Sequence, residues 1–416
     1  MENTNILDEV FEKFVNNAKI FKDRGVLRHD YLPDRLPHRE EQIKRLGETV
    51  APVLKDARCS NIFIYGKTGT GKTAVTKYVL NHLGAKAKEF NAPIMFCYVN
   101  CRLAGTEYRV FASLSQSIGV SVPFTGLSVG EVFDRFRRGL DSSKIIFIIV
   151  LDEIDALIKT RGDILLYELT RINETLRNSK VSLIGISNDL RLKEFLDPRV
   201  LSSLGEEEVV FRPYDASELR NILFERAHLA FRDEALSEGA LGLCAALAAA
   251  EHGDARRALD LLRVAGEVAE RKDANIVVEE HVREAESRIE HNRVVEALRN
   301  LTLHSKLAIL SVFHLRRANV HRAITGEIYG VYSELCGELG LTPLTQRRVS
   351  TLINELDAVG LLNAKVISMG RYGRTKKIRL EVTRTLIREV FTNDNRLGRL
   401  VKYEPKCLSK QASGRR

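Results

Sequence analysis

The glycine-rich run at residues 66–73 constrains the fold of this chain more than any other feature. It reads Gly-Lys-Thr-Gly-Thr-Gly-Lys-Thr, follows a short apolar run at 61–65 and precedes a stretch with helical periodicity. In a loop between a strand and a helix, glycines let successive backbone N–H groups face phosphate oxygens, and the helix directs its positive end at the same anion. Lys72 would add a charge to the β- and γ-phosphates and Thr73 a hydroxyl to magnesium. We therefore expect ATP or ADP with Mg²⁺ as cofactors, bound by Gly66, Thr68, Gly69, Thr70, Gly71, Lys72 and Thr73.

Four further apolar runs of strand length follow, separated by stretches with helical periodicity. They cover residues 94–99, 145–151, 181–187 and 207–211. Alternating strands and helices form a parallel sheet with helices on both faces, and runs that are apolar throughout belong to a buried sheet. The first part of the chain is therefore predicted to be an α/β domain.

Acidic residues follow the most apolar of these runs. Because ligands of parallel sheets bind at the carboxyl ends of the strands, Asp152 and Glu153 are expected beside the glycine loop. Asp152 is placed to hold magnesium together with Thr73, mainly through water, and Glu153 to orient and polarise the attacking water. Asp155 has two interpretations, a catalytic role or an acid at a helix start that the helix dipole stabilises.

Two more polar positions have both a functional and an ordinary interpretation. Asn188 ends the run at 183–187, where it could hydrogen-bond the γ-phosphate or the attacking water, although a polar residue there is usually a turn former. Arg256 follows Gly253 and Asp254 at the start of an apolar-periodic helix. It either reaches the phosphates or belongs to an ordinary surface helix start.

The strand-like pattern stops after Pro213. Residues 215–289 show only helical periodicity, which predicts a small all-helical domain. Three helical runs beyond residue 300 then precede two strand-like segments, which is the order of a winged helix. These five segments are 303–317, 325–339, 345–359, 361–367 and 377–382.

These changes of pattern divide the chain into six parts. A second change falls near residue 292, and the last residues have the composition of a disordered tail. The parts are an N-terminal arm at 1–40, the α/β domain at 41–213, a helical lid domain at 214–291, a linker helix at 292–300, a winged-helix domain at 301–405 and the tail at 406–416.

Positive charge is concentrated in the C-terminal part of the chain. From His291 onward there are 23 Lys and Arg against 10 Asp and Glu, whereas the residues before it carry 41 against 45. A basic surface of this kind suits a polyanion, and without an amphipathic lipid-anchoring helix DNA is favoured over a membrane. Double-stranded DNA is therefore the expected partner.

Basic residues occur on both elements with which a winged helix reads DNA, the third helix and the hairpin tip. The third helix begins with polar and basic residues at 345–351, while Leu352, Ile353, Leu356 and Val359 are expected to bury its other face. The hairpin tip at 369–377 is basic and contains glycines. A solubilising or a protein-binding surface is the alternative. The candidate DNA-binding residues are Arg347, Arg348, Ser350, Thr351, Arg371, Tyr372, Arg374, Lys376 and Lys377.

Other classes of protein are disfavoured by composition. The six cysteines are scattered without the spacing of a tetrahedral metal site, so we expect reduced thiols. No apolar run reaches the roughly 18 to 20 residues of a membrane span. The N-terminus has acids and amides where a secretory signal has basic and then apolar residues. A cytoplasmic, nucleoid-associated protein without a membrane partner is expected.

Several motifs together resemble those of the archaeal origin-recognition initiators, AAA+ ATPases related to the eukaryotic origin recognition complex and its helicase loader. The resemblance covers nearly the whole chain, and Pro-His-Arg-Glu at 37–40 is more diagnostic than the glycine loop. It implies an AAA+ P-loop domain with a parallel sheet, an all-helical lid and a C-terminal winged helix. It also implies slow regulatory ATP hydrolysis, binding of origin duplex DNA, an MCM-type replicative helicase as partner and paralogous initiator subunits. The motifs are 21–24, 31–42, 66–73, 152–153, 186–189, 197–200, 212–215 and 253–256.

The resemblance also implies roles for single residues. Asn188 corresponds to the first sensor, Arg256 to the second, and Arg199 to the arginine finger that acts on a neighbouring subunit's nucleotide. Tyr214 and Arg226 match positions that contact the nucleotide. The catalytic set is then Asp152, Glu153, Asn188 and Arg199, and the base pocket contains Tyr31, Pro33, Pro37 and His38.

Residues 122–140 fall where initiators carry an extra helix that can touch DNA. Arg135, Arg137 and Arg138 would suit such a contact. A solvated helix face is the more common explanation for a run of this kind, so both interpretations stay open.

Two other functions are compatible with the motifs. One is a sequence-specific DNA-binding protein whose nucleotide is structural, and the other is a winged-helix AAA+ remodeller such as a branch-migration helicase. The Pro-His-Arg-Glu stretch argues against the remodeller. An ATP-dependent replication initiator is the leading hypothesis.

Overall fold

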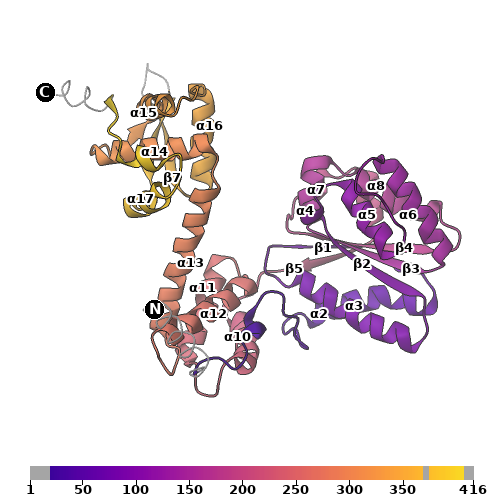
Figure 1. Cartoon of the computed structure of the whole chain (residues 1–416). Helices are drawn as coiled ribbons and strands as arrows, with labels where there is room; N and C mark the ends of the chain where they lie inside the picture. The colour runs from indigo at the N-terminus through magenta and orange to yellow at the C-terminus, as the bar shows by residue number, and fades with distance from the viewer. Residues whose placement is uncertain (1–18, 369–373, 407–416) are drawn as a thin grey trace, which may run out of the picture. The chain divides into compact units, whose positions relative to one another are not determined.

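A five-stranded parallel sheet lies at the centre of the N-terminal part of the chain (Figure 1). The computed structural model describes residues 19–368 and 374–406. All five apolar runs are confirmed as strands, and their hydrogen bonds give the order β2-β3-β4-β1-β5. The strands are β1 Ile62–Gly66, β2 Ile94–Asn100, β3 Ile146–Asp152, β4 Lys180–Ser187 and β5 Glu207–Phe211.

Alternate residues of the strands face two helical layers, as predicted for a buried parallel sheet. In β3, Ile148 and Val150 pack toward one layer, whereas Ile149 and Leu151 pack toward the other. The first layer contains α2 (Glu40–Val50), η2 (Ala51–Lys55) and α3 (Lys72–Glu89). The second contains α4 (Cys101–Ala104), α5 (Glu107–Ser117), α6 (Val129–Ser143), α7 (Ile154–Arg161), α8 (Ile164–Arg171), η3 (Ile172–Glu174), η4 (Leu192–Phe195) and α9 (Pro198–Leu204).

The strand order places the ends of three strands together. β4 lies between β1 and β3, and these strands end at Gly66, Asp152 and Ser187. Because the strands run in the same direction, their carboxyl ends share one edge of the sheet. The glycine loop, the Asp-Glu pair and the residue after β4 therefore meet at this edge.

The lid is all-helical, as predicted. Its first helix, α10 (Ala216–Ala230), begins at a capping box, in which the side chains of Asp215 and Glu218 each accept the other's backbone N–H. α11 (Glu238–Glu251) and α12 (Ala255–Arg271) follow, and α13 (Glu279–Asn300) is one helix that begins in the lid and includes residues 292–300.

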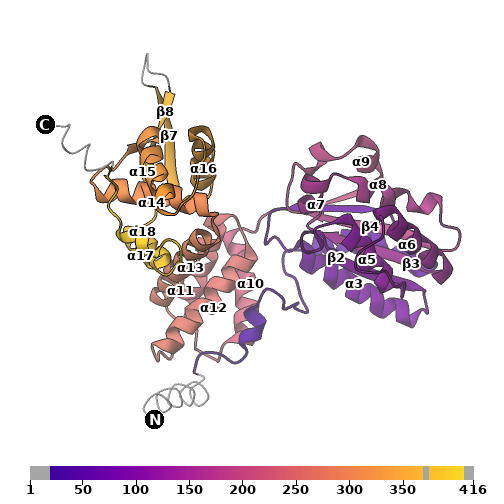
Figure 2. The same cartoon turned by 45° about the horizontal axis from the view of Figure 1, so that its top comes forward.

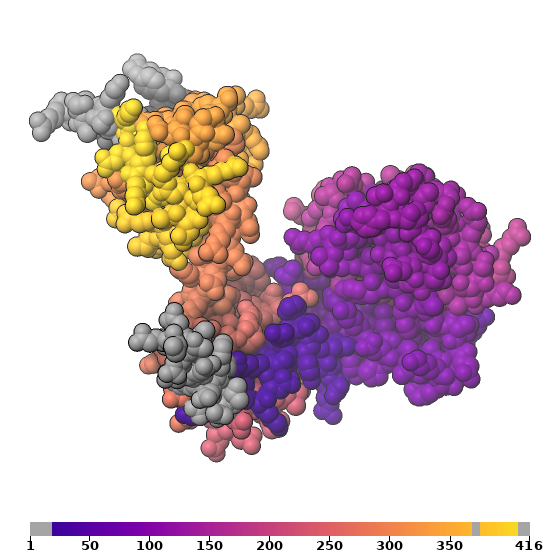
Figure 3. Space-filling model, viewed as in Figure 1, coloured from indigo at the N-terminus to yellow at the C-terminus, as the bar shows by residue number. Residues whose placement is uncertain are grey.

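The N-terminal segment packs on the lid. Phe21 forms a β-bridge with Phe231, and Lys22 N donates to the carbonyl of Ala230 at 2.8 Å. η1 (Arg24–Leu27) then contacts α10 and α12. In the space-filling view this indigo segment lies against the lid and continues to the sheet domain (Figure 3).

The second compact unit of the chain, Glu286–Arg416, contains the winged helix; the first is Met1–Ala285. The predicted order of three helices and a hairpin is confirmed, and the hairpin lies beside α15 and α16 (Figure 2). A short strand that was not predicted, β6, pairs with β8 and gives the sheet order β6-β8-β7. The elements are α14 Leu303–Arg317, β6 Ala323–Ile324, α15 Thr325–Glu338, α16 Gln346–Ala358, β7 Leu362–Ser368, β8 Arg374–Leu380, α17 Arg384–Thr392 and α18 Gly398–Lys402.

Two expectations from composition concerned membrane spans and the state of the cysteines. Within 19–368 and 374–406, no helix has both the length and the apolar character that a membrane span requires. The cysteines of these residues are buried and none of them is in a disulfide: Cys59, Cys97, Cys101, Cys244 and Cys336.

A buried histidine makes the stability of the winged-helix unit depend on pH. His314 lies on α14, is 2% exposed, and its Nε2 donates to the carbonyl of Leu400 at 3.0 Å. Burial lowers the pKa of His314 to about 4. Below its usual pKa of 6.5 the unfolded chain therefore binds more protons at this residue than the folded chain, and stability falls as the pH falls toward 4. We expect this residue to reduce the free energy of unfolding by about 2 kcal/mol between pH 7 and pH 5.

Denaturant unfolding of the full chain at both pH values measures this effect. His314→Gln keeps an N–H donor for Leu400 but does not titrate, so the variant should lose about 2 kcal/mol less than the wild type between pH 7 and pH 5. His321→Gln, at an exposed position of the same unit, is the control and should keep the wild-type pH dependence. Equal pH dependence in His314→Gln and the wild type would contradict the prediction.

Candidate nucleotide site and DNA-binding surface

A pocket in the N-terminal unit collects most of the predicted site residues. It is bounded by residues 28–37, by the glycine loop, by the ends of β3 and β4 and by the lid. Gly66, Thr68, His38 and Arg199 are not among its lining residues. The predicted residues that line it are Tyr31, Pro33, Pro37, Gly69, Thr70, Gly71, Lys72, Thr73, Asp152, Glu153, Asn188, Tyr214, Arg226 and Arg256.

The glycine loop is held in a shape that other residues rarely adopt. Gly69 and Gly71 have φ angles of 70° and 90°, in the left-handed region. A Cβ at Gly69 would lie 1.7 Å from Asp254 Oδ1, so only glycine lets the start of α12 approach the loop. Ala255 N uses this approach to donate to the Gly69 carbonyl at 3.1 Å. The lid therefore contacts the loop directly.

Lys72 provides a buried positive charge in the loop. It is 4% exposed, and its Nζ donates to the carbonyls of Gly66 at 2.8 Å and Lys67 at 2.7 Å. Burial lowers the pKa of Lys72 to about 8, and nearby Asp152 opposes this shift. A buried ammonium whose hydrogen bonds go to neutral carbonyls gains stability from an anion beside it. The loop therefore fits a phosphate group.

A carboxylate and a hydroxyl lie together beside the loop. Thr73 Oγ1 donates to Asp152 Oδ2 at 2.8 Å, and the hydroxyl of Tyr98 donates to the same oxygen. Glu153 N donates to the other oxygen, Oδ1, at 2.8 Å. Oxygen ligands of this kind suit Mg²⁺, so Thr73 and Asp152 fit the predicted ion.

Glu153 has a strained backbone at the start of α7. Its φ of 53° is left-handed, which is uncommon for a residue other than glycine and is costly unless the surrounding structure holds it. Its side chain is 25% exposed and forms an ion pair with Arg102 at 3.8 Å. The carboxylate therefore borders the pocket and contacts a cation on α4.

Asp155 holds the end of β4 against α7. Its Oδ1 accepts the backbone N–H of Asn188 at 3.0 Å and the hydroxyl of Ser187 at 3.3 Å. One turn later on α7, Lys159 pairs with Asp189 at 2.5 Å. Asp155 lies in the first turn of the helix, as one interpretation expected, and its carboxylate also anchors the residue predicted to be the first sensor.

The predicted lid arginines occupy different environments. Arg226 is buried and donates to the carbonyls of Val26 at 3.1 Å and Tyr31 at 3.2 Å, so it holds the segment of the predicted base pocket. Its guanidinium also lies over the Tyr31 ring at 4.5 Å. Arg256 N donates to the N-cap side chain of Asp254 at 2.8 Å, while the Arg256 side chain lines the pocket.

Arg199 lies on α9, outside the pocket. Its side chain is 73% exposed, pairs with Asp197 at 3.1 Å and lies 5.6 Å from the centre of the Tyr167 ring. The structure therefore does not bring Arg199 to the Asp152, Glu153 and Asn188 of its own chain.

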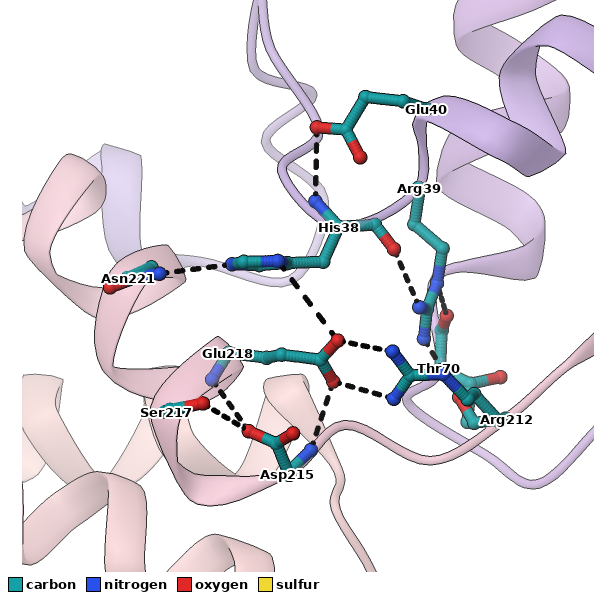
Figure 4. A network of polar contacts seen from close by, with 9 residues as sticks. All are labelled: His38, Arg39, Glu40, Thr70, Arg212, Asp215, Ser217, Glu218 and Asn221. Carbon is teal, nitrogen blue, oxygen red and sulfur yellow. Dashed lines mark hydrogen bonds and ion pairs between the residues drawn. The ribbon is translucent and has the colours of Figure 1, made fainter.

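Three residues near the pocket were missed by the sequence analysis. Tyr98 and Arg102 contact the Asp-Glu pair. Arg39 is buried with its guanidinium over the Tyr214 ring, and it donates to the Thr70 carbonyl (Figure 4). Arg39 belongs to the Pro-His-Arg-Glu stretch, for which the family resemblance implied a role at His38 but none at Arg39. Side chains alternate between the two faces of a strand, and this alternation along β2 could have predicted that Tyr98 lies on the face of the sheet that α3 covers.

Seven of the nine candidate DNA-binding residues lie on α16 and β8. Arg347 and Lys377 are exposed, and Arg348 pairs with Glu355 at 3.6 Å. Lys376 Nζ joins the two elements, because it donates to Ser350 Oγ at 2.9 Å and to Asn354 Oδ1 at 2.6 Å. Arg371 and Tyr372 lie outside the described residues; Arg374 begins β8, and Thr351 Oγ1 donates to the Arg347 carbonyl.

The buried face of α16 differs from the prediction at one end. Val349, Leu352, Ile353 and Leu356 are buried, whereas Val359 is 59% exposed. The prediction for Val359 was wrong because Val359 is the C-cap, past the last residue of α16 at Ala358, and lies outside the core cluster of the winged helix.

The arginines of α6 form local ion pairs. Arg135 pairs with Glu131 at 3.1 Å, and Arg137 pairs with Asp134 at 3.2 Å. Arg138 Nε donates to the Asp134 carbonyl at 3.3 Å. Such contacts within one helix are typical of a solvated face. They do not test whether these arginines also bind DNA, which stays a prediction.

The fold and the site define an AAA+ protein with a winged helix. A model of the AAA domain matches residues 55–192, a model of the Cdc6 AAA+ ATPase-type lid domain matches 220–287, and a model of the CDC6 C-terminal winged-helix domain matches 296–390. The chain is therefore a member of the AAA+ ATPase family with a Cdc6-type lid and winged helix.

Individual relatives define the family more narrowly. An ORC1-type DNA replication protein of Thermococcus onnurineus is 52% identical over 94% of this chain and 96% of its own length. One from Pyrococcus horikoshii is 53% identical over 93% of this chain and 94% of its own length. The structure of the Aeropyrum pernix ORC1 protein in complex with DNA is 50% identical, covers 92% of this chain and 100% of that chain, and has a TM-score of 0.85. This chain belongs to the family of ORC1-type DNA replication proteins.

Proposed function

We propose that this chain is an ATP-dependent DNA replication initiator, which binds origin duplex DNA through its AAA+ and winged-helix domains and helps to recruit the replicative helicase. One observation carries the proposal: Lys72, Asp152, Glu153, Asn188 and Arg256 line one pocket of a chain that also contains a winged helix. Relatives that are named ORC1-type DNA replication proteins support it.

In this proposal the pocket binds ATP or ADP with Mg²⁺. The glycine loop and Lys72 would hold the phosphates, Thr73 and Asp152 would hold the ion, and residues 31–38 would line the base pocket. The ion, when bound, would neutralise negative charge on the phosphate oxygens. Glu153 would accept a proton from the attacking water, and Asn188 would orient that water.

Hydrolysis would act as a slow switch of the lid. Arg256 on the lid and Lys72 on the sheet domain would face the same phosphates, so the charge of the nucleotide determines how strongly the lid is held. The ion pair between Arg102 and Glu153 supports slow hydrolysis, since Arg102 competes with the water for this carboxylate. ATP would then favour DNA engagement and helicase recruitment, and ADP would end them.

Arg199 would act on a neighbouring subunit. Its exposed guanidinium is held by Asp197 outside its own pocket, where a paralogous initiator could meet it. A paralogous initiator subunit and an MCM-type replicative helicase are the proposed protein partners.

The DNA-binding part of the proposal is tested on α16 and β8. Arg347→Ala and Lys377→Ala should each weaken binding of duplex DNA and reduce the slope of log affinity against log salt by about one, because each removes one phosphate contact. Fluorescence anisotropy of labelled duplex at several salt concentrations measures both effects. Arg388→Ala, an exposed arginine on α17, is the control and should leave the slope unchanged. Unchanged slopes for Arg347→Ala and Lys377→Ala would show that DNA binds elsewhere.

A further inference from the structure

Two consecutive residues before α2 point in opposite directions between the glycine loop and the lid. His38 has a left-handed backbone, with φ of 62°, which turns its ring toward α10. Arg39, the N-cap of α2, turns its side chain toward the glycine loop. Figure 4 shows the His38 ring beside Asn221 and Glu218, and Arg39 beside Thr70 and Arg212.

Arg39 is buried among main-chain carbonyls of distant segments. It is 1% exposed, and its Nε donates to the Thr70 carbonyl at 2.9 Å. Nη2 donates to the Arg212 carbonyl and Nη1 to the His38 carbonyl, both at 2.8 Å. The guanidinium also lies over the Tyr214 ring, 3.7 Å from its centre. A planar guanidinium can satisfy these three acceptors at once, whereas the ammonium of lysine cannot reproduce the fork.

Two of the three acceptors of Arg39 lie where the lid meets the sheet domain. Thr70 belongs to the glycine loop, and Arg212 is two residues before Tyr214, where the chain enters the lid. Tyr214 N donates to the Gly253 carbonyl at 3.2 Å, and Ala255 N donates back to the glycine loop at Gly69. Residues 212–214 form the hinge between the sheet domain and the lid. Arg39 joins the glycine loop to this hinge, the hinge is bonded to the start of α12, and the start of α12 is bonded back to the loop, so the hydrogen bonds form a closed ring.

The side chain of Arg212 extends this connection into the lid. Its guanidinium binds Glu218 on α10 through two hydrogen bonds, of 2.9 and 2.5 Å. Glu218 also accepts the Asp215 N–H at 3.0 Å, and its Oε1 lies 4.0 Å from His38 Nδ1. His38 Nε2 lies 3.1 Å from Asn221 Nδ2. The same short segment thus contacts the hinge and the first lid helix.

We propose that Arg39 is a positioning residue that couples the glycine loop to the lid, so that occupation of the loop fixes the hinge at 212–214 and closes the start of α12 over the site. The inference rests on the proposed function only in taking the occupant to be a nucleotide. Without Arg39 the carbonyls of Thr70 and Arg212 lose their partner, and of the ring only the hydrogen bonds through the start of α12 still join the loop to the hinge. The loop itself, with Lys72, remains able to bind phosphates.

The test is hydrogen exchange of the full chain with and without saturating ADP, together with ADP affinity. In the wild type, ADP should slow exchange of backbone amides both at 66–73 and at 253–262. Arg39→Met, which keeps the apolar stem, should bind ADP about tenfold more weakly. At saturation it should keep protection at 66–73 but lose protection at 253–262. Arg39→Lys should behave in the same way, because it restores the charge but not the fork.

Controls separate this inference from its alternatives. Arg45→Met removes an exposed arginine of α2, 52% exposed and paired with Glu207, and should exchange like the wild type. Equal protection of both segments in saturated Arg39→Met or Arg39→Lys would overturn the coupling and leave Arg39 a structural residue. A wild type that binds no ADP would overturn the proposed function, and this inference with it.

Discussion

Lys72→Ala is expected to abolish binding of ATP and ADP at micromolar concentrations. The variant removes a buried ammonium that would face the β- and γ-phosphates, and hydrogen bonds to charged groups contribute about 1.5–3 kcal/mol each. Loss of two such contacts raises the dissociation constant by at least about 100-fold. Calorimetric titration with ADP and with a slowly hydrolysed ATP analogue measures the change.

The control for this variant lies on the same helix. Lys88 is an exposed lysine near the end of α3, so Lys88→Ala changes the net charge equally without altering the pocket. It should bind ADP with wild-type affinity. Retained nucleotide affinity in Lys72→Ala would refute the assignment of the glycine loop as the phosphate site.

Glu153→Gln is expected to bind ATP normally but to hydrolyse it about 100-fold to 10,000-fold more slowly, the usual contribution of a general base. Glutamine keeps the size of the side chain and loses the charge that would accept the proton. Single-turnover hydrolysis of radiolabelled ATP measures the rate, and filter binding measures the retained nucleotide. Glu89→Gln, at the exposed end of α3, should hydrolyse ATP like the wild type.

The same variant separates the initiator from a DNA-binding protein with a structural nucleotide. Because ATP stays bound, a switch that depends on hydrolysis should leave Glu153→Gln on DNA with the helicase still recruited. If DNA binding and helicase recruitment respond to ATP and ADP identically in the variant and the wild type, hydrolysis does not control them. The nucleotide would then be structural.

Features carried by neighbouring residues could be predicted from the sequence. The glycine loop, the strand before it and the helix after it occupy one stretch of chain, so residue order alone encodes them. The apolar run before Asp152 likewise predicts a buried strand with acids at its carboxyl end. The winged helix was recognisable because each helix is long enough to show its period. Strand β6 (Ala323–Ile324) has two residues, too few to show a strand period.

Contacts between distant residues could not be predicted. Arg39 donates to Thr70 and to Arg212, 31 and 173 residues away, and no local pattern marks a carbonyl as an acceptor. Tyr98 reaches Asp152 because β2 and β3 are neighbours in a register that pairs Asn100 with Asp152. Strand neighbours depend on how the whole chain packs, and the apolar runs do not encode them.

Genome-wide mapping of the protein on DNA in the cell tests the central claim most directly. Immunoprecipitation of the wild-type protein followed by sequencing gives its binding sites, and marker-frequency analysis of the same culture gives the places where replication starts. An initiator should be concentrated at a few loci that coincide with those starts, and Lys72→Ala should lose this enrichment. Sites spread along the chromosome, or concentrated away from every replication start, would contradict the proposed function.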